Sequence, residues 1–257
     1  MCFRPEERSE RPLLTLTTVV CLFLAGCATE PAQDVGAAVN YVRQGLAYAA
    51  EGQHDKAIKR FAKAIKIDPM CAAAYGNRAV SYGAIGEHEK AIQDCTKVIE
   101  LRPNDAKAYV NRGTAYSRMS RYDLAIQDFT SAIQIEPENA DAFYNRGLAR
   151  QAKNENHQAI VDFSRAIKAN PRDAQAYKHS AYLHMKNDRY DIAKSDCDKA
   201  LAINPNDGEA YKQRAVAHLF LSNFDEAWED VEKAASLGHP VHPDFLNALR
   251  AASGRQR

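Results

Sequence analysis

The sequence has no excess of charge of one sign and few of the cysteines that could cross-link a fold. Its 257 residues carry 34 Lys and Arg against 33 Asp and Glu, so the net charge is +1. Nucleic-acid-binding domains normally show a clear basic excess, and no nucleic-acid partner is predicted. Only Cys71, Cys95 and Cys197 lie beyond residue 27. Three thiols cannot form a closed disulfide framework.

Signatures of catalysis and cofactor binding are missing as well. The chain has no Gly-rich phosphate loop, no GxSxG motif and no HExxH motif, the short motifs that position phosphates, nucleophiles and zinc in many enzymes. No two carboxylates are spaced so that they would obviously share a cleft, as general acid–base chemistry requires. The sequence therefore predicts no catalytic residue, no cofactor, no metal site and no small-molecule substrate.

The apolar run near the N-terminus is short. Leu13–Gly26 covers 14 residues, whereas a membrane-spanning helix needs about 20. Arg4, Arg8 and Arg11 precede the run, although three glutamates among them bring the charge of this region close to zero. Its length and position fit the hydrophobic region of a secretory signal, with residues 1–26 as the signal peptide.

This run ends in Leu24-Ala25-Gly26-Cys27, which resembles the lipobox of bacterial lipoproteins. The resemblance implies that Cys27 is acylated and becomes the mature N-terminus. Ala28 resembles the residue of outer-membrane lipoproteins, because an aspartate there would resemble inner-membrane retention. An ordinary cleaved signal and a short N-terminal anchor are the alternatives. Residues 27–37 are predicted to be the lipidated cysteine and a polar tether.

Beyond the tether, prolines recur at a fixed interval. Five of them lie 34 residues apart, at Pro69, Pro103, Pro137, Pro171 and Pro205. A fixed period of this length indicates a helical repeat array. If each proline takes position 32 of its repeat, the six repeats are 38–71, 72–105, 106–139, 140–173, 174–207 and 208–241.

Each repeat follows one template. Position 4 is aromatic in all six repeats, position 8 is Gly or Ala, and position 20 is always Ala. Position 24 is Phe in three repeats and Cys or Val in the others. Small residues at positions 8 and 20 allow two helices to approach closely, and larger side chains at positions 4 and 24 fill the gaps beside them. The proline ends the second helix.

This template resembles the tetratricopeptide repeat family from Ala38 to about Leu237. The resemblance implies an all-α fold: an α-solenoid right-handed superhelix of six helix pairs, with the first helix of each pair on the concave side. Residues 242–257 differ from the template. Phe245, Leu246 and Leu249 predict one more short helix, beginning near Pro243, that caps the array and leaves a loose tail.

Two sets of polar residues recur in register and have structural and functional interpretations. Position 7 is Arg in four repeats and position 23 is Asp in five, which favours ion pairs between helices over a ligand-binding row of arginines. His184 and His218 share position 11 in adjacent repeats. A metal site would need three or four converging ligands, so structural histidines are favoured.

The concave side is expected to carry the function. Position 6 holds amides in four of the six repeats and resembles the asparagine ladders by which some tetratricopeptide arrays hold extended peptides. An amide offers both a donor and an acceptor to a peptide unit. The alternative is that these asparagines only come with the template and face water. With basic and aromatic neighbours included, the predicted peptide-binding residues are Asn77, Asn111, Asn145, His179, Gln213, Lys107, Arg118, Tyr144, Lys178, Tyr182 and Lys212.

Six such repeats behind a lipobox resemble tetratricopeptide lipoproteins of the bacterial envelope that act as adaptors for peptidoglycan hydrolases and proteases. The resemblance implies a non-enzymatic scaffold, anchored by its lipid to the outer membrane on the periplasmic side. Its partner would be an extended protein segment with an acidic or carboxylate end. The alternative is a pilotin-like assembly factor for a secretin or pilus component.

Overall fold

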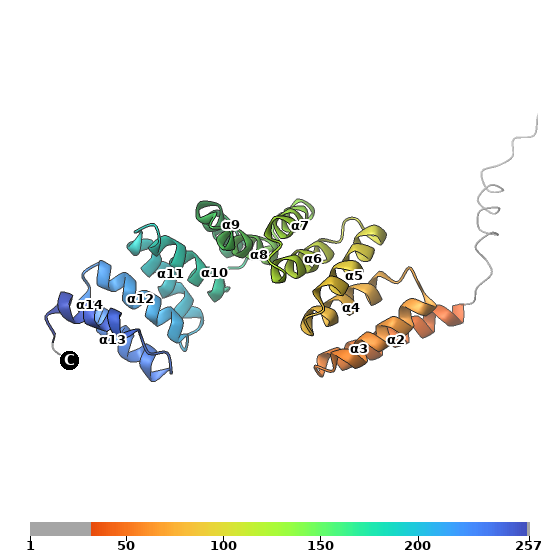
Figure 1. Ribbon diagram of the computed structural model, residues 1–257, viewed down its shortest axis with the longest axis horizontal. Helices are drawn as coiled ribbons and strands as arrows, with labels where there is room; N and C mark the ends of the chain where they lie inside the picture. Colours follow the sequence, from red (N-terminus) through yellow and green to blue (C-terminus); the bar gives the residue numbers. More distant parts are fainter. Residues whose placement is uncertain (1–31, 256–257) are drawn as a thin grey trace, which may run out of the picture.

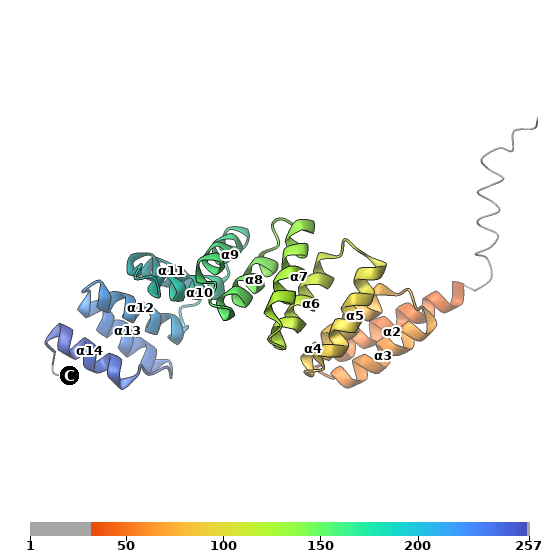
Figure 2. The same cartoon turned by 45° about the horizontal axis from the view of Figure 1, so that its top comes forward.

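The computed structural model describes residues 32–255, which form thirteen α-helices and no β-strand. Successive helices pair antiparallel along an arch (Figures 1 and 2). Their bounds are α2 (Ala32–Ala50), α3 (His54–Ile67), α4 (Ala72–Ala84), α5 (His88–Leu101), α6 (Ala106–Arg118), α7 (Tyr122–Ile135), α8 (Ala140–Ala152), α9 (Asn156–Ala169), α10 (Ala174–Met185), α11 (Tyr190–Ile203), α12 (Gly208–Phe220), α13 (Phe224–Ser236) and α14 (Pro243–Ser253).

The helix boundaries follow local sequence signals. From α6 on, each first helix begins after an Asp or Asn whose side chain accepts a hydrogen bond from a backbone N–H of the first turn, as Asp105 does from Ala108 at 3.0 Å. The turn inside each repeat has a residue with positive φ at position 15. This residue is Gly52 or Gly86 in the first two repeats, where glycine adopts that conformation without steric cost.

The predicted tether is wrong over residues 32–37. Helix α2 begins at Ala32, within the segment expected to be irregular. Its 19 residues make it longer than any other helix in the described part of the chain. Each residue added to an existing helix contributes a hydrogen bond without a new nucleation cost, so the first helix extends beyond the template.

The first helices line the inner side of the arch. α2, α4, α6 and α8 contact one another in sequence, as α10 contacts α12, whereas the second helices make no comparable contacts with each other. Helices on the side of smaller radius must lie closer together. In Figure 1, α6 and α8 accordingly lie on the inner side of α7 and α9.

Close packing of position 8 on position 24 holds each pair together. A Cβ atom at Gly45, Gly113 or Gly147 would lie 2.5 to 2.8 Å from the ring of the phenylalanine at position 24 of the same repeat. Where position 24 is Cys or Val, position 8 is Ala. The two positions therefore compensate for each other in volume, as dense packing requires.

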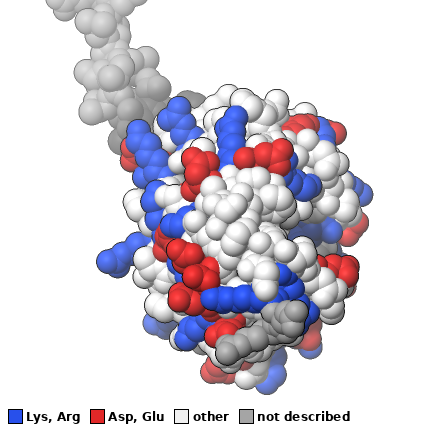
Figure 3. All heavy atoms as spheres, turned by 90° about the vertical axis from the view of Figure 1, so that its left-hand side faces the viewer, with Lys and Arg blue, Asp and Glu red and all other residues white. Residues whose placement is uncertain are grey.

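The C-terminal helix caps the array. α14 packs against α13, with Leu249 fully buried and the indole Nε1 of Trp228 donating to Ser253 Oγ at 3.2 Å. At this end of the molecule, Figure 3 shows acidic and basic side chains interspersed around a neutral centre. Within residues 32–255 no helix is both long enough and apolar enough to cross a membrane.

Candidate peptide-binding groove

The inner face contains two separate hollowed regions. The first lies between α4 and α6, where two adjoining cavities of about 140 and 230 Å³ include four predicted binding residues, Asn77, Lys107, Asn111 and Arg118, in their walls. The second lies along α10 and α12, where adjoining hollows of about 380 and 290 Å³ are lined by five others. These five are Lys178, His179, Tyr182, Lys212 and Gln213.

The amides at position 6 are less free than predicted. Asn77 Nδ2 donates to Ala73 O and Asn145 Nδ2 donates to Asp141 O, both at 2.8 Å within their own helix. The acceptor oxygen and one N–H remain available on each. The side-chain amide of Asn111 has no hydrogen-bond partner within residues 32–255, so both its donor and its acceptor are available.

Two of the lysines predicted to bind a partner, Lys178 and Lys212, are already paired with carboxylates. Lys178 Nζ lies 2.7 Å from Asp207 Oδ2, and both side chains are largely buried; Lys212 Nζ lies 2.8 Å from Glu209 Oε2. Burial favours a raised pKa for Asp207, but hydrogen bonds from Lys178 and from two backbone N–H groups hold this pKa below its ordinary value. These two lysines are therefore internally neutralised.

Two predicted residues, Tyr144 and His179, pack against each other at the edge of the second hollowed region. The His179 ring stacks on Phe163 with centroids 5.4 Å apart, and the Tyr144 ring lies 5.8 Å from His179 and 5.9 Å from Phe163. His179 Nδ1 is also 3.2 Å from Gln151 Oε1. Burial lowers the pKa of His179 and favours the neutral imidazole. These three rings form part of the contact between repeats 4 and 5. Tyr144 and His179 are therefore less available to a partner than predicted.

Exposed aromatic rings distinguish the hollow between repeats 5 and 6. Phe220 is 58% exposed and Tyr182 is 39% exposed, although both are large rings. Tyr190 stacks on Phe220 with centroids 4.2 Å apart and an interplanar angle of 6°. The ammonium of Lys186 lies 5.3 Å from the Tyr182 centroid. Gln213 lines the same hollow, and its buried Oε1 has no hydrogen-bond partner in the described part of the chain.

Sequence reasoning missed an apolar row beside the amides. Position 9 also faces the inner side, and Leu46 and Val80 are each nearly half exposed there. The same position is Leu148 in repeat 4 and Val216 in repeat 6. An apolar residue recurring at a position predicted to face solvent was the available signal. Tyr190 was not detectable in this way, because it reaches the hollow from the start of a second helix.

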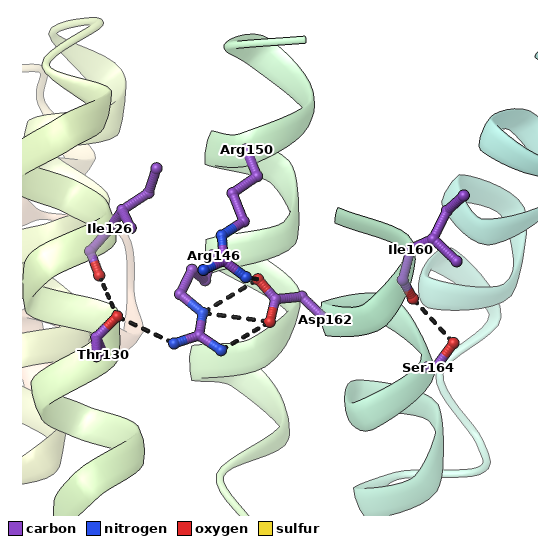
Figure 4. A network of polar contacts seen from close by, with 7 residues as sticks. All are labelled: Ile126, Thr130, Arg146, Arg150, Ile160, Asp162 and Ser164. Atoms are coloured by element: carbon purple, nitrogen blue, oxygen red, sulfur yellow. Dashed lines mark hydrogen bonds and ion pairs between the residues drawn. The ribbon is translucent and has the colours of Figure 1, made fainter. Parts of the chain in front are cut away.

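The arginines of position 7 are structural. In each of four repeats the guanidinium binds the position-23 aspartate of the same repeat, as Arg146 binds Asp162 with a shortest distance of 2.7 Å. Arg146 also donates to Thr130 Oγ1 of the preceding repeat at 3.0 Å (Figure 4). Arg150 provides a second cation, 2.7 Å from Asp162. The network therefore ties the two helices of one repeat to the repeat before it.

Repeat 5 lacks this connection because Ser180 replaces the arginine. Ser164, equivalent to Thr130, donates to Ile160 O at 2.8 Å, as Thr130 does to Ile126 O, but no arginine donates to its hydroxyl in the described part of the chain (Figure 4). Asp196 is buried without a guanidinium; burial raises its pKa, while the Ser180 hydroxyl and nearby His184 oppose that rise. α9 also packs less extensively on α10 than the other second helices do on the first helix that follows them.

The remaining reactive residue types occupy packed surroundings. Burial lowers the pKa of both His184 and His218, and His218 Nδ1 lies 3.3 Å from Asn223 Nδ2. No group of three or more potential metal ligands occurs in residues 32–255. Burial raises the pKa of Cys95 and of Cys197 to about 12. The predicted lipidation site, Cys27, lies outside the described residues.

The chain matches known repeat sequences over most of its folded part. Models described as tetratricopeptide repeat match residues 72–105, 106–139 and 144–208, and one described as TPR repeat matches residues 45–86. Among curated proteins, none matches the chain significantly.

Solved structures with the same architecture extend this similarity. YrrB, described as a TPR protein with an unusual peptide-binding site, is 26% identical with a TM-score of 0.60, covering 75% of this chain and 97% of its own. MamA is 27% identical with a TM-score of 0.58, covering 63% of this chain and 94% of its own. PilF of Pseudomonas aeruginosa is 22% identical with a TM-score of 0.73, covering 87% and 100%, and supports the fold.

Proposed function

Because the chain is a tetratricopeptide repeat protein, we propose that it is a non-enzymatic scaffold that holds an extended segment of a protein partner along its inner face. The observation that carries this proposal is the hollow between repeats 5 and 6. Exposed aromatic side chains in a concavity are typical of binding hot spots, since covering them removes a large apolar area from water. Gln213, whose Oε1 has no hydrogen-bond partner in the described part of the chain, also lines this hollow.

The similarity to YrrB supports the same function. YrrB is described as having a peptide-binding site, and it is similar to three quarters of this chain. Lys178 and Lys212 already form ion pairs with carboxylates of this chain. We therefore expect the partner segment to bind this hollow through apolar side chains more than through acidic ones. An aromatic or aliphatic side chain would stack on Phe220 and Tyr182, with the polar groups at the rim holding the backbone.

Phe220→Ala is expected to weaken binding of a partner segment at least tenfold, which corresponds to about 1.4 kcal/mol. The probe is a peptide selected from a random displayed library against the purified protein, and its Kd is measured by fluorescence anisotropy. Ile192→Ala is the matched control. Ile192 is likewise an exposed apolar residue, at 39%, but it lies on the second helix α11. Selected peptides that bind the Phe220 variant as tightly as the parent would contradict the groove mechanism.

We further propose that Cys27 anchors this scaffold to the bacterial envelope, at the outer membrane facing the periplasm. Support comes from the lipobox alone. Two or three acyl chains hold a protein nearly permanently, whereas one binds marginally. Since α2 begins at Ala32, only residues 28–31 separate Cys27 from the helix, so Cys27 and the helix start can be at most about 18 Å apart. The repeats would therefore lie against the membrane surface.

Cys27→Ser is expected to release the protein from the membrane fraction. Mass spectrometry of the N-terminal peptide from the parent should show the added diacylglycerol, and an unmodified Cys27 peptide would refute the anchor.

The pilotin-like alternative rests on the same anchor and repeats. It predicts loss of an assembled multimer when the gene is deleted, whereas an adaptor predicts altered turnover of the cell wall.

A further inference from the structure

We infer that the cleft between α4 and α6 is a second subsite, which receives one aliphatic side chain of a partner segment that carries carboxylates on both sides of it. This inference rests on the proposed function, because it assigns a ligand chemistry to another part of the same inner face. The two cavities of the cleft adjoin and share Val80, Cys95 and Asn111 in their walls.

The cleft exists because repeat 2 lacks side chains that other repeats have. Position 24 is a fully buried Phe in repeats 1, 3 and 4, whereas in repeat 2 it is Cys95. Position 5 is Gly76 and position 12 is Gly83, and a Cβ added at Gly83 would meet no atom within 4 Å. In repeat 4, by contrast, Tyr144 at position 5 packs on Phe163. Repeat 2 therefore has neither ring, and the space opens to the groove.

Repeat 5 shows that the cysteine alone does not open a cleft of this kind. Cys197 also occupies position 24, with Ala181 at position 8. There, however, Met185 at position 12 packs against the Cys197 cluster, and the larger side chain of Lys178 replaces the glycine at position 5. The combination of Gly76, Gly83 and Cys95 is what leaves the α4–α6 cleft open.

The cleft is lined by apolar side chains in its middle and by a cationic side chain near each end. Val80, Val98 and Cys95 form apolar parts of the lining. Lys107 and Arg118 lie near opposite ends of α6, and neither has an ion-pair partner within residues 32–255. Asp105, the acidic residue in this lining, is already engaged as the N-cap of α6. A ligand that carries negative charge at both ends complements this arrangement.

The spacing of the two cations sets the spacing of the ligand's carboxylates. Lys107 and Arg118 are eleven residues apart on α6, which is about 16 Å along a helix at 1.5 Å per residue. An extended segment advances about 3.3 Å per residue. If its apolar side chain enters the middle of the cleft, acidic residues two or three positions away on each side lie near the cations. Asn111, with no internal partner, lies between them and is available to the segment's backbone.

The first test uses a defined probe: a heptapeptide with leucine at its centre, a glycine on each side and two glutamates at each end. Binding is followed by NMR through the methyl signals of Val80 and Val98 in the purified protein. We expect saturable shifts of these signals with a Kd of about 0.1–1 mM. Replacement of the peptide leucine by serine, or of its glutamates by lysine, should weaken binding at least tenfold. Absence of shifts at these methyls up to millimolar peptide would overturn the inference.

Protein variants separate the contributions of charge and cavity. Arg118→Glu should weaken binding of the heptapeptide at least tenfold. Arg165→Glu is the control, because Arg165 is exposed on the second helix α9, and it should leave the Kd unchanged. Ala79→Gly/Cys95→Phe gives repeat 2 the packing pair of repeats 1, 3 and 4 and fills the cleft. It should retain the parent's thermal midpoint and lose the Val80 shifts.

A second filling variant keeps the test decisive if the double variant does not fold. Gly83→Leu adds a side chain where the backbone has open space, and it should block the heptapeptide while the helix content stays the same. Unchanged peptide affinity in a folded filling variant would refute the subsite. Failure here is distinguishable from failure of the proposed function, because a library-selected peptide that depends on Phe220 would still bind.

Discussion

Arg146→Met is expected to lower the free energy of unfolding by about 3 kcal/mol, because it removes one of the two cations that pair with a buried carboxylate. Asp162 is only 1% exposed and accepts hydrogen bonds from both Arg146 and Arg150. The remaining Arg150 keeps the loss at the lower end of the range for a broken buried pair. The measurement is urea-induced unfolding followed by circular dichroism.

The control for Arg146 is a cation removed from an exposed pair. Lys153 Nζ lies 2.6 Å from Asp123, which is 78% exposed, and Lys153→Met should lower stability far less than Arg146→Met does, because water screens exposed ion pairs. If the two substitutions lowered the free energy of unfolding equally, burial of Asp162 would not strengthen the contribution of its ion pair. Arg146→Met should also broaden the transition, since it removes the contact to Thr130 that couples repeats 3 and 4.

Gly113→Ala is expected to lower the free energy of unfolding when residue 129 is Phe and to raise it when residue 129 is Cys. In the parent, the new Cβ would lie 2.8 Å from the Phe129 ring, and overpacking of this kind costs about 1–3 kcal/mol. In a Phe129→Cys background the clash is gone, and replacement of a helical glycine by alanine should stabilise by about 0.5–1 kcal/mol. Repeats 2 and 5 already contain this Ala–Cys pair. Urea unfolding of the four proteins of the cycle measures the coupling.

Gly83→Ala provides the control for this cycle. Position 83 is also a helical glycine, but no atom lies within 4 Å of an added Cβ. It should stabilise the protein whether position 129 is Phe or Cys. If Gly113→Ala stabilises the parent as much as Gly83→Ala does, then the close contact of positions 8 and 24 does not limit the packing.

The interface between repeats 4 and 5 is expected to be the weakest in the described array, because α9 packs less extensively on α10 than the other second helices do on the first helix that follows them. Repeat 5 has Ser180 in place of the arginine, and its joint with repeat 4 depends on the stacked rings of Phe163 and His179 and the neighbouring Tyr144. Solenoid stability is a sum of repeat and interface contributions, so a weak interface allows parts to unfold separately. This interface borders the second hollowed region, whose wall includes Gln151 and His179. A partner that occupies both regions would bridge it.

The repeat register could be predicted from the sequence because its causes are local. The prolines and the Asp or Asn caps act within one or two turns of helix, and position 8 packs on position 24 of the same repeat. Each copy therefore specifies its own helix pair. The inner face could be predicted for the same reason. Asn77, Lys107, Asn111 and Arg118 line the first hollowed region, and Tyr182 with Gln213 lines the second.

Only the tertiary structure decided which polar groups are free to bind. Lys178 is neutralised by Asp207, 29 residues further along the chain, and the arginines of position 7 bind residues 16 positions away in both directions. Such pairings depend on how neighbouring repeats stack. The open cleft at Cys95 likewise arises from side chains missing at three positions of repeat 2. A sequence pattern records which residues recur, whereas the space left by a missing ring exists only after the helices pack.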